Sequence, residues 1–261
     1  MNDINSGGVI ILDFGSQYTQ LIARRIRERN VFSEIMEPTI PLSGILKKEP
    51  SGLILSGGPS SVNDINSPIL DYKIIESGIP ILGICYGLHI LTKFYGGIVE
   101  SSGKGEYGPE MIEVENSQGF LEGIHSPSKV WMSHGDKVKK IPDGWQILAR
   151  SSNNIIAAIA NNNQSHVATQ FHPEVYHTLE GDVILNNFLF KIAKCKPNWT
   201  PNNFIKEKIG IIKNIVGDSK ALVGVSGGVD STIVAALMHK AIGKRSNAVL
   251  IDHGLMRLYE S

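Results

Sequence analysis

Short apolar runs that alternate with helical stretches are the feature that most restricts the fold of this chain. Four such runs occupy residues 9–12, 31–36, 53–55 and 79–84. Between the first two, residues 18–29 place apolar side chains at helical spacing. Repeated strand–helix–strand spacing predicts a mostly parallel sheet with helices on both faces, so the expected fold class is α/β. Ligands of such sheets bind at the carboxyl ends of the strands.

Residues 96–170 differ in pattern from the start of the chain. After another helical stretch at 69–77, they contain shorter alternating runs that are broken by Gly, Asn and Pro. Alternation of apolar and polar residues is typical of strands with one buried face, which predicts added antiparallel strands. Helical periodicity returns at 179–193. A mixed sheet is therefore expected.

A polar stretch with two prolines, residues 194–203, predicts a boundary between two domains. We place the first domain at 8–195, the linker at 196–203 and the second domain at 204–261. The strand–helix–strand pattern restarts after the linker, and the second domain is expected to be incomplete because only its opening precedes Ser261. Its expected elements are a helix at 204–216, a strand at 221–225, a helix at 231–242 and a strand at 248–252.

Charge and cysteine content narrow the classes of function. Lys plus Arg and Asp plus Glu both number 25, so no excess charge suggests nucleic acid as a partner. The two cysteines, Cys85 and Cys195, are too few for a disulfide framework and stand in no zinc-binding cluster. The first residues lack the apolar core of a signal peptide, and no run reaches the ~18 apolar residues of a membrane span. We expect a cytoplasmic protein with small-molecule ligands and no metal site.

Cys85 follows the run at 79–84 and opens a predicted helix. A residue at such a turn lies at a helix N-terminus, where free backbone N–H groups and the helix dipole favour a thiolate. Gly83 and Gly87 flank it, and G-x-C-x-G is the cysteine form of the nucleophile elbow G-x-S-x-G. The alternative is a buried structural cysteine, which behaves as a small hydrophobic residue.

A nucleophilic cysteine needs a base, and His172 in VATQFHPEV is the first candidate. Residues i and i+2 of an extended chain share a face, so Glu174 can orient the imidazole. His134 in WMSHGDKV is the second candidate base. Charge that develops on a substrate oxygen would be met by the N–H of Tyr86, just after the cysteine, and by the loop at 57–58.

The segment SGGVDS, residues 226–231, follows an apolar strand and opens a helix. Backbone N–H groups at a glycine-rich helix N-terminus bind anions, which predicts a phosphate loop. The loop lacks the Lys-Ser/Thr ending of a Walker A motif, so a γ-phosphate kinase or ATPase is not indicated. The candidate ATP-binding residues are Ser226, Gly227, Gly228, Val229, Asp230, Ser231 and Thr232.

Four motifs, SGGP, GICYGLH, WMSHGDKV and QFHPE, resemble in type and spacing those of the class I glutamine amidotransferase family. The segments DFGSQYTQLIARRIRE and KPNWTP, the latter ahead of SGGVDS, make residues 8–261 similar to the glutamine-hydrolysing GMP synthases. The resemblance implies a flavodoxin-like mixed sheet with helices on both faces. An incomplete Rossmann-like β-α-β segment of an N-type ATP pyrophosphatase would follow it.

The resemblance also implies roles for individual residues. Cys85 would attack the carboxamide of glutamine to form a glutamyl thioester, while His172, oriented by Glu174, moves the protons. Gly57 and Tyr86 would supply the oxyanion hole. Further contacts to glutamine would come from Gly58, His89, Ser133 and His134.

Cofactors and partners follow from the same resemblance. ATP and Mg²⁺ would serve a synthetase half that adenylates XMP and lets ammonia displace AMP to give GMP. The glutaminase step would need no cofactor. Beyond these small molecules, the expected partner is a missing synthetase polypeptide or a second copy in a homodimer, with no nucleic acid and no membrane.

Two departures from the family pattern leave other functions open. His89 stands where the family has the Gln of C-x-G-x-Q, which predicts weaker glutamine binding, and His253 replaces the Asn of Asp-Asn-Gly. These departures and the early end of the chain are compatible with a catalytically silent module. A third interpretation is the glutaminase component of another pathway, such as anthranilate synthesis, but such a component has no use for a pyrophosphate loop.

Overall fold

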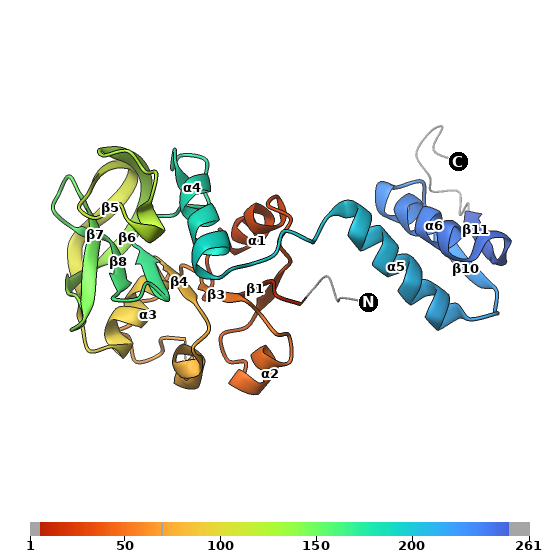
Figure 1. The fold of residues 1–261 in the computed structure, drawn as a ribbon, viewed down its shortest axis with the longest axis horizontal. Helices are drawn as coiled ribbons and strands as arrows, with labels where there is room; N and C mark the ends of the chain where they lie inside the picture. The colour runs from red at the N-terminus through yellow and green to blue at the C-terminus, as the bar shows by residue number, and fades with distance from the viewer. Residues whose placement is uncertain (1–5, 69, 251–261) are drawn as a thin grey trace. The chain divides into compact units, whose positions relative to one another are not determined.

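The computed structural model describes residues 6–68 and 70–250, and the chain divides into two compact units, Met1–Asn198 and Trp199–Ser261 (Figure 1). The boundary between the units falls inside the polar stretch at 194–203. None of the helices described in either unit has the length and apolar character needed to cross a bilayer.

The first unit is built on a nine-stranded sheet with the strand order β2-β1-β3-β4-β9-β8-β7-β5-β6. The first five strands in this order are parallel, and the other four add to them in antiparallel fashion. This mixed α/β sheet confirms the predicted fold class. The parallel strands are β1 (Val9–Leu12), β2 (Ser33–Met36), β3 (Gly52–Leu55), β4 (Ile81–Ile84) and β9 (His166–Thr169). The antiparallel strands are β5 (Ile98–Val114), β6 (Ser128–Lys140), β7 (Trp145–Ser151) and β8 (Ile156–Asn161).

Helices cover both faces of the parallel strands, which explains why these strands read as continuous apolar runs (Figure 1). Along β1, Val9 and Ile11 belong to one buried cluster, and Ile10 and Leu12 belong to the other. Each large apolar side chain buried in this way contributes ~1.5–3 kcal/mol, so the two clusters fix the position of the strand. The covering helices are α1 (Thr19–Arg27) and α4 (Gly181–Asn186) on one face, and α2 (Leu42–Leu46), η1 (Tyr72–Ser77) and α3 (Tyr86–Phe94) on the other.

The helix predicted at 179–193 differs from the observed segment in its hydrogen bonding. It begins at Gly181 as α4 and continues as a π-helical segment, η3 (Asn187–Ile192). The buried Asn187 amide donates to the carbonyls of Phe120 and Glu122 at N–O distances of 3.0 and 2.8 Å, which ties this segment to the short helix η2 (Gly119–Leu121). Of the stretch predicted at 69–77, residues 72–77 form the 3₁₀ helix η1, and residue 69 lies outside the described residues.

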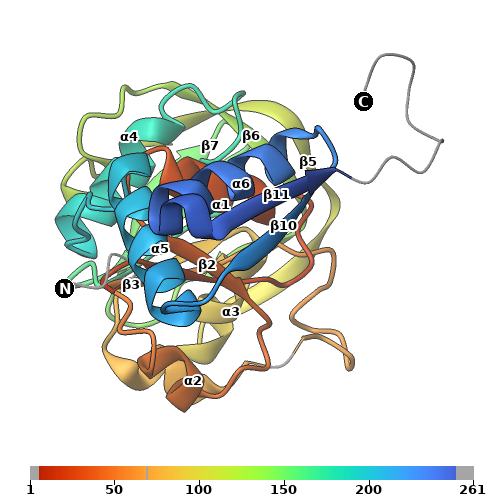
Figure 2. The same cartoon turned by 90° about the vertical axis from the view of Figure 1, so that its right-hand side faces the viewer.

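The second unit consists of α5 (Pro201–Val216), β10 (Ala221–Val225), α6 (Val229–Ile242), η4 (Gly243–Arg245) and β11 (Ser246–Leu250). Strands β10 and β11 are parallel, and Figure 2 shows α6 beside them. Helix α5 begins three residues before the predicted start at Phe204. The Thr200 hydroxyl accepts from the Asn203 N–H and Pro201 occupies the first helical position, and both features favour a helix start. Residues 251–253, with His253 among them, lie outside the described residues.

Candidate active site

Cys85 occupies the turn between β4 and α3. Its φ of 51° and ψ of −98° form a backbone conformation that residues with a Cβ rarely adopt and that is found at functional sites. Its N–H donates to the Thr169 carbonyl of β9 at an N–O distance of 2.7 Å. In the first turn of α3 only glycine fits at position 87, because a Cβ on Gly87 would collide with the Leu55 carbonyl. The sulfur is therefore held at a helix N-terminus.

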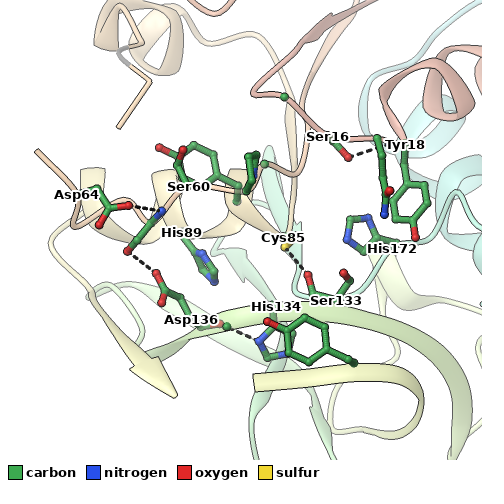
Figure 3. A pocket seen from close by; sticks show the side chains of 18 residues that line it. Ser16, Tyr18, Ser60, Asp64, Cys85, His89, Ser133, His134, Asp136 and His172 are labelled. Carbon is green, nitrogen blue, oxygen red and sulfur yellow. Dashed lines mark hydrogen bonds between the residues drawn. The ribbon is translucent and has the colours of Figure 1, made fainter. Parts of the chain in front are cut away.

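Three polar groups surround the sulfur of Cys85. The Ser133 carbonyl oxygen lies 3.6 Å from Sγ (Figure 3), and the Gln170 amide nitrogen lies 3.9 Å from it. The His172 ring lies beside the sulfur, and the two residues line the same cavity. The main chain of the SGGP loop also lies against this site. A Cβ built on Gly57 would stand 3.1 Å from Cε1 of His172 and 3.6 Å from Cβ of Cys85.

His172 and Glu174 follow β9 and are both buried. Nδ1 of His172 lies 2.8 Å from Oε1 of Glu174. The main chain of His172 is fixed on both sides, because its N–H donates to the Trp131 carbonyl and its carbonyl accepts from the Thr178 hydroxyl at 2.6 Å. The guanidinium of Arg25, on α1, donates to the Glu174 carbonyl at 3.0 Å. The structure thus brings the thiol, the imidazole and the carboxylate into one chain of contacts.

The charge on Glu174 decides the protonation state of His172. Burial alone would lower the pKa of His172, but the Glu174 carboxylate and the hydrogen bonds to Cys85 and Glu174 outweigh it and raise that pKa to about 10. At neutral pH the imidazole therefore carries both protons. One points at Glu174, and the other is available to the sulfur or to a group that leaves from a substrate.

This pKa shift predicts how stability depends on pH. The unfolded value is ~6.5, so the shift to about 10 contributes stability that is fully present below pH ~6.5 and is lost as pH rises through about 10. In a Cys85→Ala background the contribution of Glu174 to the raised pKa of His172 remains while that of Cys85 is removed, so the unfolding free energy is expected to fall by up to ~1.4 kcal/mol per pH unit above pH ~6.5, over a narrower range than in the unchanged protein. Urea unfolding at successive pH values, followed by tryptophan fluorescence, measures it.

The matched control for this pH dependence is Cys85→Ala combined with Glu174→Gln. Without the carboxylate, the reason for the raised pKa of His172 is gone, so the fall above pH ~6.5 should be much smaller. Equal pH dependence in the two proteins would contradict the assignment to the His172–Glu174 pair.

His134, the second candidate base, has both ring nitrogens engaged away from the sulfur. Nε2 lies 3.2 Å from Oε2 of Glu106, and Nδ1 lies 2.8 Å from the Asp136 carbonyl oxygen. Glu106 is buried and also accepts from the Ser151 hydroxyl at 2.9 Å and from the Asn153 amide at 2.8 Å. This network fixes the strand segment that carries the Ser133 carbonyl. The arrangement favours His172 as the base.

A cavity of about 530 Å³ opens beside the sulfur (Figure 3). Cys85 and His172 line it together with two carboxylates, Asp64 and Asp136, and no Lys or Arg is among the described residues that line it. Ser61 joins the carboxylates, since its N–H donates to Asp64 at 3.0 Å and its hydroxyl donates to Asp136 at 2.5 Å. The cavity is therefore acidic at this part of its wall. Of the other predicted residues, Gly58, Tyr86, His89, Ser133 and His134 also line it.

His89 is buried one helical turn after Cys85, on α3. Its Nε2 lies 2.9 Å from Oε1 of Gln170, a fully buried side chain that sequence reasoning did not select. Burial lowers the pKa of His89 to about 4, so its ring is neutral at physiological pH. His89 therefore contacts Gln170 as well as the cavity.

The SGGVDS loop lies in the second unit, between β10 and α6. Gly227 has a φ of +81°, which favours glycine, and α6 begins at Val229. The Ser231 hydroxyl donates to the Gly228 carbonyl at 3.0 Å and accepts from the Ser226 N–H at 3.2 Å, which closes the loop on itself. The hydroxyl of Thr232 donates to the same carbonyl at 2.9 Å. Among the described residues, no group of three or more His, Cys, Asp or Glu side chains could hold a metal ion.

Two family models match this chain. The model described as glutamine amidotransferase class-I matches residues 10–192, and the model described as NAD synthase matches residues 202–255. The chain is 47% identical over 253 residues to a glutamine-hydrolyzing GMP synthase of Brachyspira hyodysenteriae, and 48% identical over 252 residues to that of Aquifex aeolicus. Each match covers 97% of this chain and 49% of the relative. The chain thus spans about half the length of these curated relatives.

Two solved structures resemble this chain in fold. A Thermoplasma acidophilum protein described as one subunit of a GMP synthase superposes with a TM-score of 0.65 at 30% identity, over 72% of this chain and 94% of that one. A glutamine amidotransferase of Thermotoga maritima gives a TM-score of 0.54 at 19% identity, over 91% of this chain and 98% of that one. The second likeness concerns the fold alone.

Proposed function

Since this chain belongs to the class I glutamine amidotransferase family, we propose that its first unit hydrolyses glutamine to glutamate and ammonia through Cys85, His172 and Glu174. The observation that carries the proposal is the contact chain at the elbow. The sulfur at the N-terminus of α3 lines one cavity with His172, whose Nδ1 lies 2.8 Å from a buried carboxylate.

Each group has a role in the two steps of the proposed reaction. Sγ of Cys85 attacks the carboxamide carbon, and the negative oxygen that forms accepts from the N–H groups of Tyr86 and of the loop at 57–58. The protonated His172 then donates its proton to the leaving nitrogen, so that ammonia departs and a glutamyl thioester remains. Neutral His172 next takes a proton from water, which attacks the thioester and releases glutamate and the thiolate. Glu174 holds the ring in place throughout.

The cavity suits the amino-acid end of glutamine. Asp64 and Asp136 lie on its wall, and a carboxylate attracts an ammonium group at short range. The volume of about 530 Å³ accommodates a small amino acid together with water.

His89→Gln is expected to lower the KM for glutamine about five-fold, the effect of one added hydrogen bond. The neutral ring of His89 has one N–H, and its Nε2 faces Gln170 at 2.9 Å. A glutamine at this position would have a second N–H and a carbonyl oxygen left for the substrate. Initial rates over a range of glutamine concentrations give KM. An unchanged KM would mean that position 89 does not weaken binding.

We further propose that the ammonia serves the ATP-dependent amination of XMP to GMP, as the similarity to GMP synthases suggests. The free N–H groups at the start of α6 and the hydroxyls of Ser226 and Ser231 suit a bound pyrophosphate group. The Asp230 carboxylate is an oxygen ligand of the kind that Mg²⁺ prefers. GMP formation would also need the synthetase part of the relatives that lies beyond the matched half.

The test is to measure glutamate release by the purified chain, with and without ATP, Mg²⁺ and XMP, and then with a separately expressed synthetase half. Release by the chain alone supports the glutaminase, and GMP formation with the added half supports the pathway assignment. No release under any condition, the added half included, would favour the catalytically silent module.

A further inference from the structure

Gln170 is a second polar side chain directed at the sulfur of Cys85. It precedes His172 by two residues and is fully buried. Its backbone N–H donates to the Ala157 carbonyl at 2.8 Å, so β8 and β9 fix its position. Its side-chain nitrogen lies 3.9 Å from Sγ, and its side-chain oxygen lies 2.9 Å from Nε2 of His89.

The contact with His89 determines which end of the Gln170 amide faces the sulfur. His89 is neutral, because burial lowers its pKa to about 4, and so one of its nitrogens carries a proton. A proton on Nε2 donates to Oε1 of Gln170, which turns the NH₂ group toward Sγ. The reverse orientation would place a carbonyl oxygen against a sulfur that becomes negative in the reaction.

Because Gln170 is buried, the orientation of its amide has a larger energetic effect than it would have at the surface. A polar group removed from water is costly unless it has a partner, so a buried amide is held by the groups at both its ends. A donor beside a thiolate is also worth more in such surroundings than at the surface, because the local dielectric constant is low. The two ends of Gln170 therefore link the ring of His89 to the reacting atom.

We propose that Gln170 is a catalytic residue whose side-chain amide stabilises the thiolate of Cys85, and that His89 is a positioning residue that holds the amide in the donating orientation. The inference rests on the proposed glutaminase function, because it concerns the same sulfur. The Gln170 amide would be a hydrogen-bond donor to the sulfur in addition to His172 and to the backbone N–H groups at the turn.

Alkylation of Cys85 by iodoacetamide tests this role without using glutamine. In this reaction the thiolate displaces iodide, so the rate reports the thiolate fraction and its reactivity. Gln170→Leu is expected to slow alkylation at pH 7 about ten-fold, as the loss of one hydrogen bond to a charged group predicts, and to move the pH profile of alkylation to higher pH. Gln170→Glu should be at least as slow, because it places a carboxylate beside the sulfur. Peptide mass spectrometry separates the signal of Cys85 from that of Cys195.

The role of His89 is tested by loss and rescue. His89→Leu removes the N–H that holds the amide and should slow alkylation severalfold, whereas His89→Gln keeps a donor at the same reach and should stay within about two-fold of the unchanged protein. If His89 had only a structural role, the alkylation rate would not depend on whether the side chain at position 89 can donate a hydrogen bond. Gln146→Glu is the matched control, since Gln146 is a partly buried glutamine whose amide oxygen accepts from Asn116 and does not line the cavity.

Near-UV circular dichroism identifies the variants that fold. If Gln170→Leu does not fold, Gln170→Glu and His89→Gln still test the proposal. A folded Gln170→Leu or Gln170→Glu protein with the unchanged rate and pH profile would overturn the inference, even if the chain hydrolyses glutamine. If no glutamate is released under any condition, the added synthetase half included, but Cys85 responds to these variants as described, the result would support the contact and overturn the proposed glutaminase. The two failures are therefore distinguishable.

Discussion

Replacing Cys85 with alanine is expected to reduce glutamate release at least about 10⁴-fold, since the loss of the nucleophile from a triad leaves only substrate binding and oxyanion stabilisation. The backbone conformation of the turn at residue 85 should not be altered by this substitution. Alanine is close in size to cysteine, and the hydrogen bond to the Thr169 carbonyl comes from the backbone N–H of residue 85. Release is measured by coupling glutamate to glutamate dehydrogenase, with the variant purified on unused resin so that no active enzyme is carried over.

The other thiol of the first unit gives a matched control. Cys195 is also buried, but burial raises its pKa to about 12, so it is not ionised at physiological pH. It packs in the apolar cluster that contains Phe188 and Leu189. Cys195→Ala is therefore expected to reduce stability by removing a packed side chain while glutamate release stays within about two-fold. Comparable losses of activity in the two variants would show that stability, rather than the Cys85 sulfur, explains the result.

The parallel half of the sheet could be predicted from local sequence because both faces of its strands are buried. The residues of β1, β3 and β4 are all buried, which makes each strand a continuous apolar run. Cys85, His172 and Glu174 were selected from the sequence for a related reason. A glycine-flanked turn and an i, i+2 spacing are local patterns. In the structure Cys85 and His172 line one cavity, and Nδ1 of His172 lies 2.8 Å from Oε1 of Glu174.

The surroundings of the site could not be predicted in the same way, because they depend on contacts between distant parts of the chain. Glu106 reaches His134 across 28 positions, and Gln170 reaches His89 across 81. Nothing around Glu106 in the sequence marks it as buried. Gln170 stands two and four positions before His172 and Glu174, but residues 170–174 form bends and a turn after β9, not the extended segment that the i, i+2 argument assumes.

Glu174→Gln is expected to lower kcat about 10³–10⁴-fold with a much smaller change in KM. In serine proteases the corresponding Asp→Asn change has an effect of about 10⁴, because the amide stabilises the wrong tautomer of the histidine. Here the carboxylate also keeps His172 protonated, and the pKa of His172 would fall without it. Protonated His172 is the acid that the leaving ammonia needs. The kcat and KM of the two proteins, measured from pH 6 to 9, test the prediction.

The environment of Glu174 also affects how this replacement changes stability. Its Oε1 faces His172, while its buried Oε2 has no hydrogen-bond partner within the part of the chain that the structure describes. A buried carboxylate with so few donors is an unfavourable group for the folded state, so its replacement by a neutral amide of the same shape removes a desolvation penalty as well as an attraction. The loss of the raised pKa of His172 opposes this gain, so we expect the difference in unfolding free energy between the two proteins to change as pH rises from ~6.5 to about 10.

The matched control is Glu180→Gln, because Glu180 is also hydrogen-bonded to a histidine but lies outside the cavity. Its Oε1 is 2.5 Å from Nδ1 of His125, whose ring is exposed, and neither residue lines the site. This variant should keep kcat within about two-fold. If Glu174→Gln also kept its kcat, His172 would not need the carboxylate for its protonation state or its orientation. The protonated state of His172 that Glu174 maintains beside Cys85 would then have no role in the release of ammonia.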